Sequence, residues 1–215
     1  MSKVLIAISS CEQYECRDLN SPLRDTWLQD LPENWSYKFF HGRGSKPRED
    51  VVVLDCADQY YALTDKTKLK FRWAVENGYD YLYACYADQY ARLERLRDCG
   101  FEGHQYYGTT AHNCPGPIYC QGSPGYFIRS DAAKLVAYAR ESYPNDDCFV
   151  ADILRKHGIV PKHDDRFKYL GPGPLATNDV IANHLSPQPG GYTAFGMFEE
   201  HRRWLESLSA SLASA

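Results

Sequence analysis

The chain has 215 residues, of which 44% are hydrophobic and 24% charged, and its 28 acidic residues outnumber its 24 lysines and arginines. This composition is typical of globular proteins and excludes a chain that is disordered throughout. The formal net charge of -4 provides neither a basic field for a nucleic-acid backbone nor a basic helix for an anionic membrane. We therefore expect no nucleic-acid partner.

The hydrophobic runs of the sequence also predict neither a membrane-spanning helix nor a signal peptide. No apolar run approaches the roughly 18 residues of a membrane-spanning helix, and the first run, residues 4–8, is too short for the apolar core of a signal peptide. We expect a soluble, cytoplasmic protein with no membrane anchor in this chain. Its length suits one domain over residues 1–215, because domains commonly have about 100–200 residues.

The eight cysteines include no Cys-x-x-Cys pair. A chain of this size and apolar content does not need disulfides to fold, so we expect most of the thiols to be reduced. An alternative is a zinc site built from His104, His112, Cys114 and Cys120, although their spacing matches no known zinc pattern.

Hydrophobic runs and turn residues predict strands that alternate with helices in the first half of the chain. In chain order we expect a buried strand at 3–9, a short helix at 22–28, strands at 36–40 and 50–55, a helix at 63–76 and a strand at 79–85. The helix at 63–76 is the clearest, because one face is spaced at helical intervals and Asn77-Gly78 ends it.

The second half is less regular. We expect a helix at 90–97, extended segments at 104–108 and 119–129, helices at 131–141 and 147–157, strands at 167–170 and 180–184, and an amphipathic helix from 192 to about 208. Residues 199–215 would then be the end of this helix and a tail that frays.

This order of elements predicts an α/β fold with a half-Rossmann central mixed sheet flanked by helices. Ligands of open α/β sheets bind beyond the carboxyl ends of the strands, which here are residues 9–10, 41–42, 55 and 86–88. No Gly-x-Gly-x-x-Gly follows the first strand, and the chain has no P-loop motif. Dinucleotide redox chemistry and P-loop phosphoryl transfer therefore lose their main support.

Five segments resemble, in order, one family of enzymes. Leu-Arg-Asp-Thr-Trp at 23–27 is similar to an Ile-Arg-x-Thr-Trp segment, and 55–67 is similar to Asp-Phe-x-Asp-Ser-Tyr-x-Asn-Leu-Thr-x-Lys-Thr. Residues 79–96 resemble a strand followed by Asp-Asp-Asp-x-Tyr-Val, 119–130 resemble Tyr-x-x-Gly-x-Gly-Tyr-Val-x-Ser, and 146–151 stand where Glu-Asp-Val-x-Val-Gly is found. These motifs belong to the β-1,3-galactosyltransferase and Fringe-like glycosyltransferases of family 31, and the resemblance spans residues 4 to about 188.

The resemblance implies a GT-A-like single domain and an inverting, metal-dependent transfer of a sugar. The donor would be a UDP-sugar, the cofactor Mn²⁺ or Mg²⁺, and the acceptor a hydroxyl of a glycan or glycoprotein. The chain departs from the family at the acidic triplet, which here is Tyr86-Ala87-Asp88. Only the last aspartate remains, and the loss of the others weakens metal binding, changes the donor or leaves the protein inactive.

The resemblance also assigns roles to individual residues. Asp147 would be the catalytic base, and Asp88 and His184 would hold the metal. The donor would contact the residues Ser9, Arg24, Lys66, Tyr86, Ala87, Asp88, Gly122 and Gly125.

Other interpretations stay open for these residues. Asp146 is a second candidate base, and either aspartate suits a helix N-cap. Asp88 is alternatively a solvated strand-end aspartate, His184 an ordinary histidine, and Arg24 and Lys66 solvated helix residues with local ion pairs. The glycines also suit plain turns. For the whole chain, the alternative is a catalytically inactive nucleotide- or sugar-binding module of the same fold.

Overall fold

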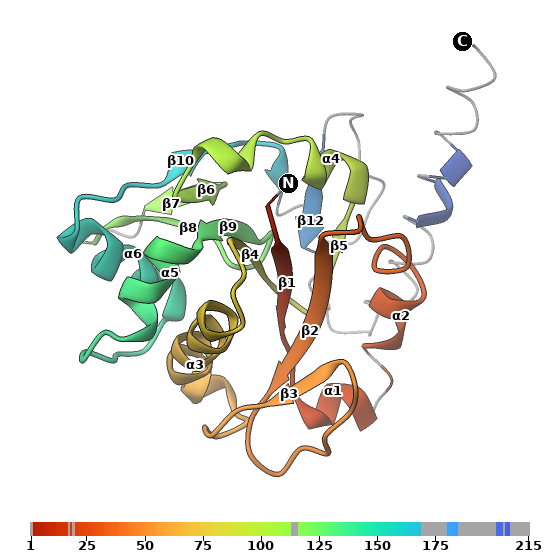
Figure 1. The fold of residues 1–215 in the computed structure, drawn as a ribbon, viewed down its shortest axis with the longest axis horizontal. Helices are drawn as coiled ribbons and strands as arrows, with labels where there is room; N and C mark the ends of the chain where they lie inside the picture. Colours follow the sequence, from red (N-terminus) through yellow and green to blue (C-terminus); the bar gives the residue numbers. More distant parts are fainter. Residues whose placement is uncertain are drawn as a thin grey trace.

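The computed structural model describes residues 2–16, 18, 20–112, 116–168, 180–184, 201–203 and 205–206. These residues form a mixed α/β structure around a seven-stranded sheet in the order β10-β6-β9-β4-β1-β2-β3 (Figure 1). Its strands are β1 (Val4–Ser9), β2 (Trp35–His41), β3 (Val51–Val53), β4 (Tyr81–Tyr86), β6 (Tyr106–Gly108), β9 (Tyr126–Arg129) and β10 (Lys162–His163).

The sheet is parallel in its first half and mixed in its second. β1 pairs in parallel with both β2 and β4, and β2 pairs in parallel with β3. β9 runs antiparallel to both of its neighbours, β4 and β6. The prediction of a mixed central sheet with flanking helices is therefore confirmed, and the carboxyl ends of β1 and β4 lie side by side.

Three helices cover one face of the sheet: α3 (Leu63–Glu76), α5 (Ser130–Ala137) and α6 (Asp146–Lys156) (Figure 1). Because side chains alternate along a strand, Leu5 and Ala7 of β1 pack with Phe71 of α3 on this face. Val4, Ile6 and Ile8 face the opposite layer. β1 is buried along its whole length, as an apolar run without polar alternation predicts.

The opposite layer consists of shorter pieces. It includes apolar side chains from α2 (Ser21–Arg24), α4 (Leu93–Arg97) and the 3-10 turn η2 (Phe101–Gly103). A small sheet in the order β11-β12-β5 joins Phe167–Lys168, Ala182–His184 and Gln89–Ala91, and β7 (Thr110–His112) pairs with β8 (Ile118–Cys120). The remaining short elements are α1 (Glu12–Cys16) and η1 (Tyr60–Ala62).

Several predicted elements differ from the structure. The helix expected at 131–141 ends at Ala137, and the strand expected at 50–55 covers only Val51–Val53. The expected helix at 90–97 begins only at Leu93, because residues 89–91 form β5 and pair with β12. The extended segment at 119–129 is two strands in different sheets, separated by the turn at 121–125. The helix expected at 22–28 is the single turn α2, after which the Thr26 hydroxyl donates to the carbonyl of Pro22 at 2.5 Å, a local bond that competes with a longer helix.

Most of the amphipathic helix expected from 192 to 208 lies outside the described residues, although 201–203 and 205–206 are helical. The seven cysteines that the structure describes are free thiols, as expected, and Cys114 lies outside the described residues. Over the described ranges, no helix combines the length and the apolar character needed to cross a membrane.

Candidate functional site

A cleft of about 690 Å³ opens at the carboxyl ends of β1 and β4. Its wall is formed by the strand-end residues 9–11 and 86–88, by the segment 58–66 that leads into α3, and by residues 144–147 at the start of α6. This is the edge where ligands of α/β sheets bind. Two of the strand ends singled out in the sequence meet here, whereas residues 41–42 and 55 do not line the cleft.

Acidic residues outnumber basic ones in the cleft. Among the described residues of its lining, Asp58, Asp88, Asp146 and Asp147 carry carboxyl groups and Lys66 carries an ammonium group. Lys66 is only 3% exposed, and its Nζ lies 2.7 Å from Oδ1 of Asp58. The charges of these two side chains therefore offset each other. An anionic ligand therefore needs a bound cation to enter favourably.

Asp147 is placed at the start of α6 without serving as its cap. The cap is Asn145, whose side chain accepts the backbone N–H of Cys148 at 3.1 Å. Asp147 instead accepts the backbone N–H of Gly122 at 2.9 Å through Oδ2. Burial, reinforced by the neighbouring Asp146 carboxylate, raises the pKa of Asp147 to about 8. A carboxyl group with this pKa is largely protonated at pH 7, and its ionised form, which increases as the pH rises toward 8, is a stronger base than an ordinary carboxylate.

Gly122 allows the close approach on which this contact depends. A Cβ at this position would lie 2.5 Å from Oδ1 of Asp147 and 2.9 Å from the Tyr86 ring, closer than side chains pack. Gly125 is needed for a different reason, since its φ of +79° favours glycine and a Cβ would meet the Tyr83 hydroxyl. Both glycines therefore shape the turn between β8 and β9, and only Gly122 touches the candidate base.

Asp146 is held by two hydroxyl groups. The Tyr86 hydroxyl lies 3.0 Å and 2.9 Å from its two carboxylate oxygens, and Thr67 Oγ1 donates to it at 3.0 Å. Asp146 is only 8% exposed, so its oxygens are occupied within the protein. This arrangement favours Asp147 over Asp146 as the base, and it ties the end of β4 to the start of α6.

A second buried lysine lies below the cleft, one helical turn from Lys66. Lys66 Nζ donates to the carbonyl of Ser10 at 2.6 Å, and Lys70 Nζ donates to Ser9 Oγ at 2.8 Å. Burial lowers the pKa of Lys70 to about 8, against the opposing attraction of Asp146. Lys70 was not predicted as a site residue, although its place beside Phe71 on the apolar face of the helix indicates a buried lysine.

One predicted metal ligand, Asp88, directly precedes β5, and the other, His184, is the last residue of β12, which pairs with β5. Asp88 lines the cleft directly before β5, and Gln89 of β5 lies opposite His184 of β12 in the antiparallel register. The backbone thus brings these distant positions together, whereas the His184 side chain lies outside the described part of the structure. Across the described residues, no group of three or more His, Cys, Asp or Glu side chains is placed to hold a metal; the zinc alternative includes Cys114, which lies outside those residues.

The remaining predicted donor contacts differ in whether they line the cleft. Ser9 and Ala87 line the cleft and join β1 to β4, where the Ala87 N–H donates to the Ser9 carbonyl at 3.2 Å. Arg24 does not line it. Its guanidinium binds Glu15 at 2.9 Å and Asp50 at 2.7 Å, which is the local ion pairing that the sequence left open as an alternative.

Comparison with known proteins adds no relative on which this site could be aligned: no protein-family model matches the chain, and neither does any of the curated proteins.

Proposed function

We propose that the chain is a metal-dependent inverting glycosyltransferase with a GT-A-like fold that moves a sugar from a UDP-sugar to a hydroxyl of a glycan or glycoprotein. The observation that carries the proposal is Asp147. Its carboxylate lines a cleft at the carboxyl ends of parallel strands, is fixed by the Gly122 N–H and has its pKa raised to about 8. The motifs that resemble family 31 supply the identity of the reaction.

In this proposal Asp147 acts as the general base. Its carboxylate takes the proton from the acceptor hydroxyl as the acceptor oxygen forms a bond to the anomeric carbon of the donor sugar. The bond from that carbon to the diphosphate oxygen breaks on the opposite side, UDP leaves with the electron pair, and the anomeric configuration is inverted. General-base catalysis of this kind contributes about 10²–10⁴-fold to a rate.

The proposal includes a hard divalent cation, Mn²⁺ or Mg²⁺. We assign to it the carboxylate of Asp88, which lines the cleft, and the imidazole of His184, whose backbone lies opposite Gln89 in the β5–β12 pairing. When bound, such a cation would neutralise charge on the leaving diphosphate. The surplus of carboxylates in the cleft supports this requirement, because a nucleotide diphosphate alone would be repelled.

The alternative is an inactive binding module of the same fold, and one feature favours it. Two positions of the acidic triplet carry Tyr86 and Ala87, of which Tyr86 is engaged with Asp146 and Ala87 is buried. Neither can hold a ribose or a metal-bound water as an aspartate does. The cytoplasmic location expected from the sequence remains a proposal under either function.

Two measurements test the proposal. A ligand that binds the native state raises its melting temperature, so UDP is expected to stabilise the protein more than GDP or CMP, and only with Mn²⁺ or Mg²⁺. UDP release from UDP-glucose, UDP-galactose and UDP-N-acetylglucosamine with a glycan acceptor then separates the two functions. Binding of UDP without release from any donor would establish the module instead.

A further inference from the structure

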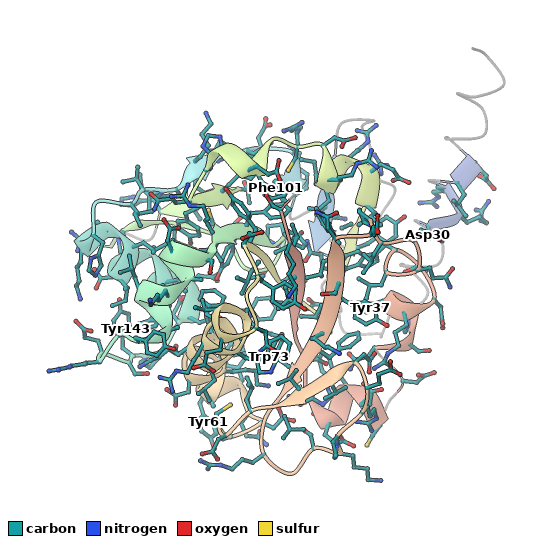
Figure 2. All side chains as sticks on the ribbon, in the orientation of Figure 1. Asp30, Tyr37, Tyr61, Trp73, Phe101 and Tyr143 are labelled. Carbon is teal, nitrogen blue, oxygen red and sulfur yellow. The ribbon has the colours of Figure 1, made fainter. Side chains whose placement is uncertain are left out.

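Two neighbouring tyrosines at the mouth of the cleft are more exposed than a folded protein requires. Tyr60 and Tyr61 are 88% and 79% exposed, the highest values among the large hydrophobic side chains that the structure describes. Both line the cleft, and Figure 2 shows Tyr61 at the periphery of the molecule, in the segment that leads into α3. Adjacent exposed aromatic rings at a cleft indicate a binding surface.

The backbone that carries these rings is fixed on both sides. Before them, Asp58 accepts the N–H of Glu12 at 2.9 Å, the N–H of Gly42 at 2.6 Å and Lys66 Nζ at 2.7 Å. Behind them, the Thr64 hydroxyl donates to the carbonyl of Tyr143 at 2.8 Å. The same bond joins the tyrosine wall to the segment that runs into Asp147. The rings are therefore presented on an ordered support, which lowers the entropic cost of binding.

The charge around the rings selects the chemistry of the ligand. Among the described residues that line the cleft, four aspartates face one lysine, Lys66, which is paired with Asp58. A surplus of carboxyl groups disfavours an anionic ligand at the tyrosines unless a cation is bound. The ligand that makes use of both kinds of group has an apolar face for the rings and hydroxyl groups for the carboxylates. A neutral saccharide combines these properties, because its ring has a C–H face and a hydroxyl rim.

We propose that Tyr60 and Tyr61 form the subsite that binds the acceptor saccharide and presents its hydroxyl to Asp147. This inference rests on the proposed function, since it takes the cleft to be a transfer site. It adds to that function the two side chains that contact the sugar ring of the acceptor.

Ligand-observed NMR by saturation transfer tests the subsite without turnover. The probes are methyl glycosides of glucose, galactose, N-acetylglucosamine and N-acetylgalactosamine, each at millimolar concentration. At least one should receive saturation from the wild-type protein on its C–H face. Tyr60→Ala and Tyr61→Ala should each weaken this binding by about tenfold, as expected for loss of an aromatic contact, whereas Tyr60→Phe and Tyr61→Phe should retain it.

The controls separate this subsite from the donor site and from the fold. Tyr138→Ala removes another exposed tyrosine, 49% exposed and outside the cleft, and should bind the glycosides as the wild type does. The stabilisation by UDP with Mn²⁺ should be unchanged in all the tyrosine variants. Loss of UDP binding in Tyr60→Ala or Tyr61→Ala would overturn the inference by assigning the rings to the nucleobase.

Absence of glycoside binding to the wild type, or binding that survives both alanine substitutions, would also overturn it. Glycoside binding that depends on the tyrosines in a protein that releases no UDP would instead defeat the proposed transfer and leave the saccharide subsite standing.

Discussion

Three features of its surroundings set the pKa of Asp147: burial, a neighbouring carboxylate and a backbone N–H donor. Burial and Asp146 favour its protonated form, and the Gly122 N–H opposes them. Because its pKa is raised to about 8, the folded protein retains a proton that the unfolded chain releases near pH 4. The contribution of Asp147 to the free energy of unfolding is therefore fully present below about pH 4 and is lost as the pH rises through about 8.

This linkage predicts the behaviour of Asp147→Asn. The amide keeps the shape of the side chain and does not titrate, so the variant should gain stability relative to wild type as the pH is raised from 5 to 8.5. A difference of 1 kcal/mol corresponds to about 2–4 °C in melting temperature for a chain of this size. The control is Asp65→Asn on the exposed face of α3. If the two variants show the same pH dependence, Asp147 does not have a raised pKa.

Gly122 provides a second prediction at the scale of one residue. In Gly122→Ala the added methyl group would occupy space now taken by the Asp147 carboxylate and the Tyr86 ring. Displacement of a catalytic group by about 1 Å costs up to about 10²-fold in rate, so sugar transfer should fall at least tenfold. Gly103→Ala is the matched control, because a Cβ there meets no atom within 4 Å. Equal transfer rates in the two variants would mean that this close approach has no functional role.

The sequence left open whether Asp147 or Asp146 is the base and whether either of them caps the helix. Capping belongs to Asn145, and the Asp146 oxygens are occupied by Tyr86 and Thr67. Neither fact could be read from the sequence, since Tyr86 is 60 residues from Asp146. The choice of Asp147 and Gly122 rested on the family resemblance, and their contact is a property of the folded chain.

Among the elements, β4, α3 and α6 are joined by a single buried carboxylate. Asp146 at the start of α6 accepts hydrogen bonds from Tyr86 at the end of β4 and from Thr67 in α3. A buried acceptor that loses a donor costs about 1–3 kcal/mol. The contact therefore fixes the wall of the cleft that carries Asp147.

Tyr86→Phe tests this connection, because it removes the hydroxyl and keeps the ring beside Gly122. We expect a loss of about 1–3 kcal/mol in the free energy of unfolding, measured by urea denaturation. Tyr138→Phe is the control, since its hydroxyl contacts Glu76 at 3.0 Å on the surface and should contribute much less. A Tyr86→Phe variant as stable as the control would show that the hydroxyl does not hold these elements together.

The sequence predicts elements well where the signal is local and poorly where pairing is distant. The helix at 63–76 matches α3 at both ends, because its spacing and its Asn77-Gly78 stop lie within one segment. Residues 90–91 were assigned to a helix, but they pair with β12 about 90 residues away. Lys70 was missed as a site residue because its partner, Ser9, is 61 residues distant.

At the scale of the whole molecule, the fold gathers the candidate site from segments spread along the chain. The parallel pairing of β1 and β4 places their ends together, α3 supplies the two lysines below them, and the β5–β12 pairing brings residue 184 beside residue 89. The sequence predicted this edge of the sheet from the general behaviour of α/β folds.

The metal assignment makes a prediction that involves this whole arrangement. Asp88→Ala and His184→Ala should each abolish the Mn²⁺-dependent rise in melting temperature with UDP, because each removes one of the two assigned ligands. Asp98→Ala is the control, because this aspartate pairs with Arg97 on the surface and lies outside the cleft lining. Full UDP and Mn²⁺ stabilisation in both variants would remove the metal site from the account.

The central claim, transfer of a sugar with Asp147 as base, is tested most directly by one paired measurement. UDP release and UDP affinity are measured in the presence of Mn²⁺ for the wild type and for Asp147→Asn. A general base predicts near-normal UDP affinity with release reduced by about 10²–10⁴-fold. Release by Asp147→Asn within about threefold of the wild-type rate, far less than the loss of a general base, would contradict the account.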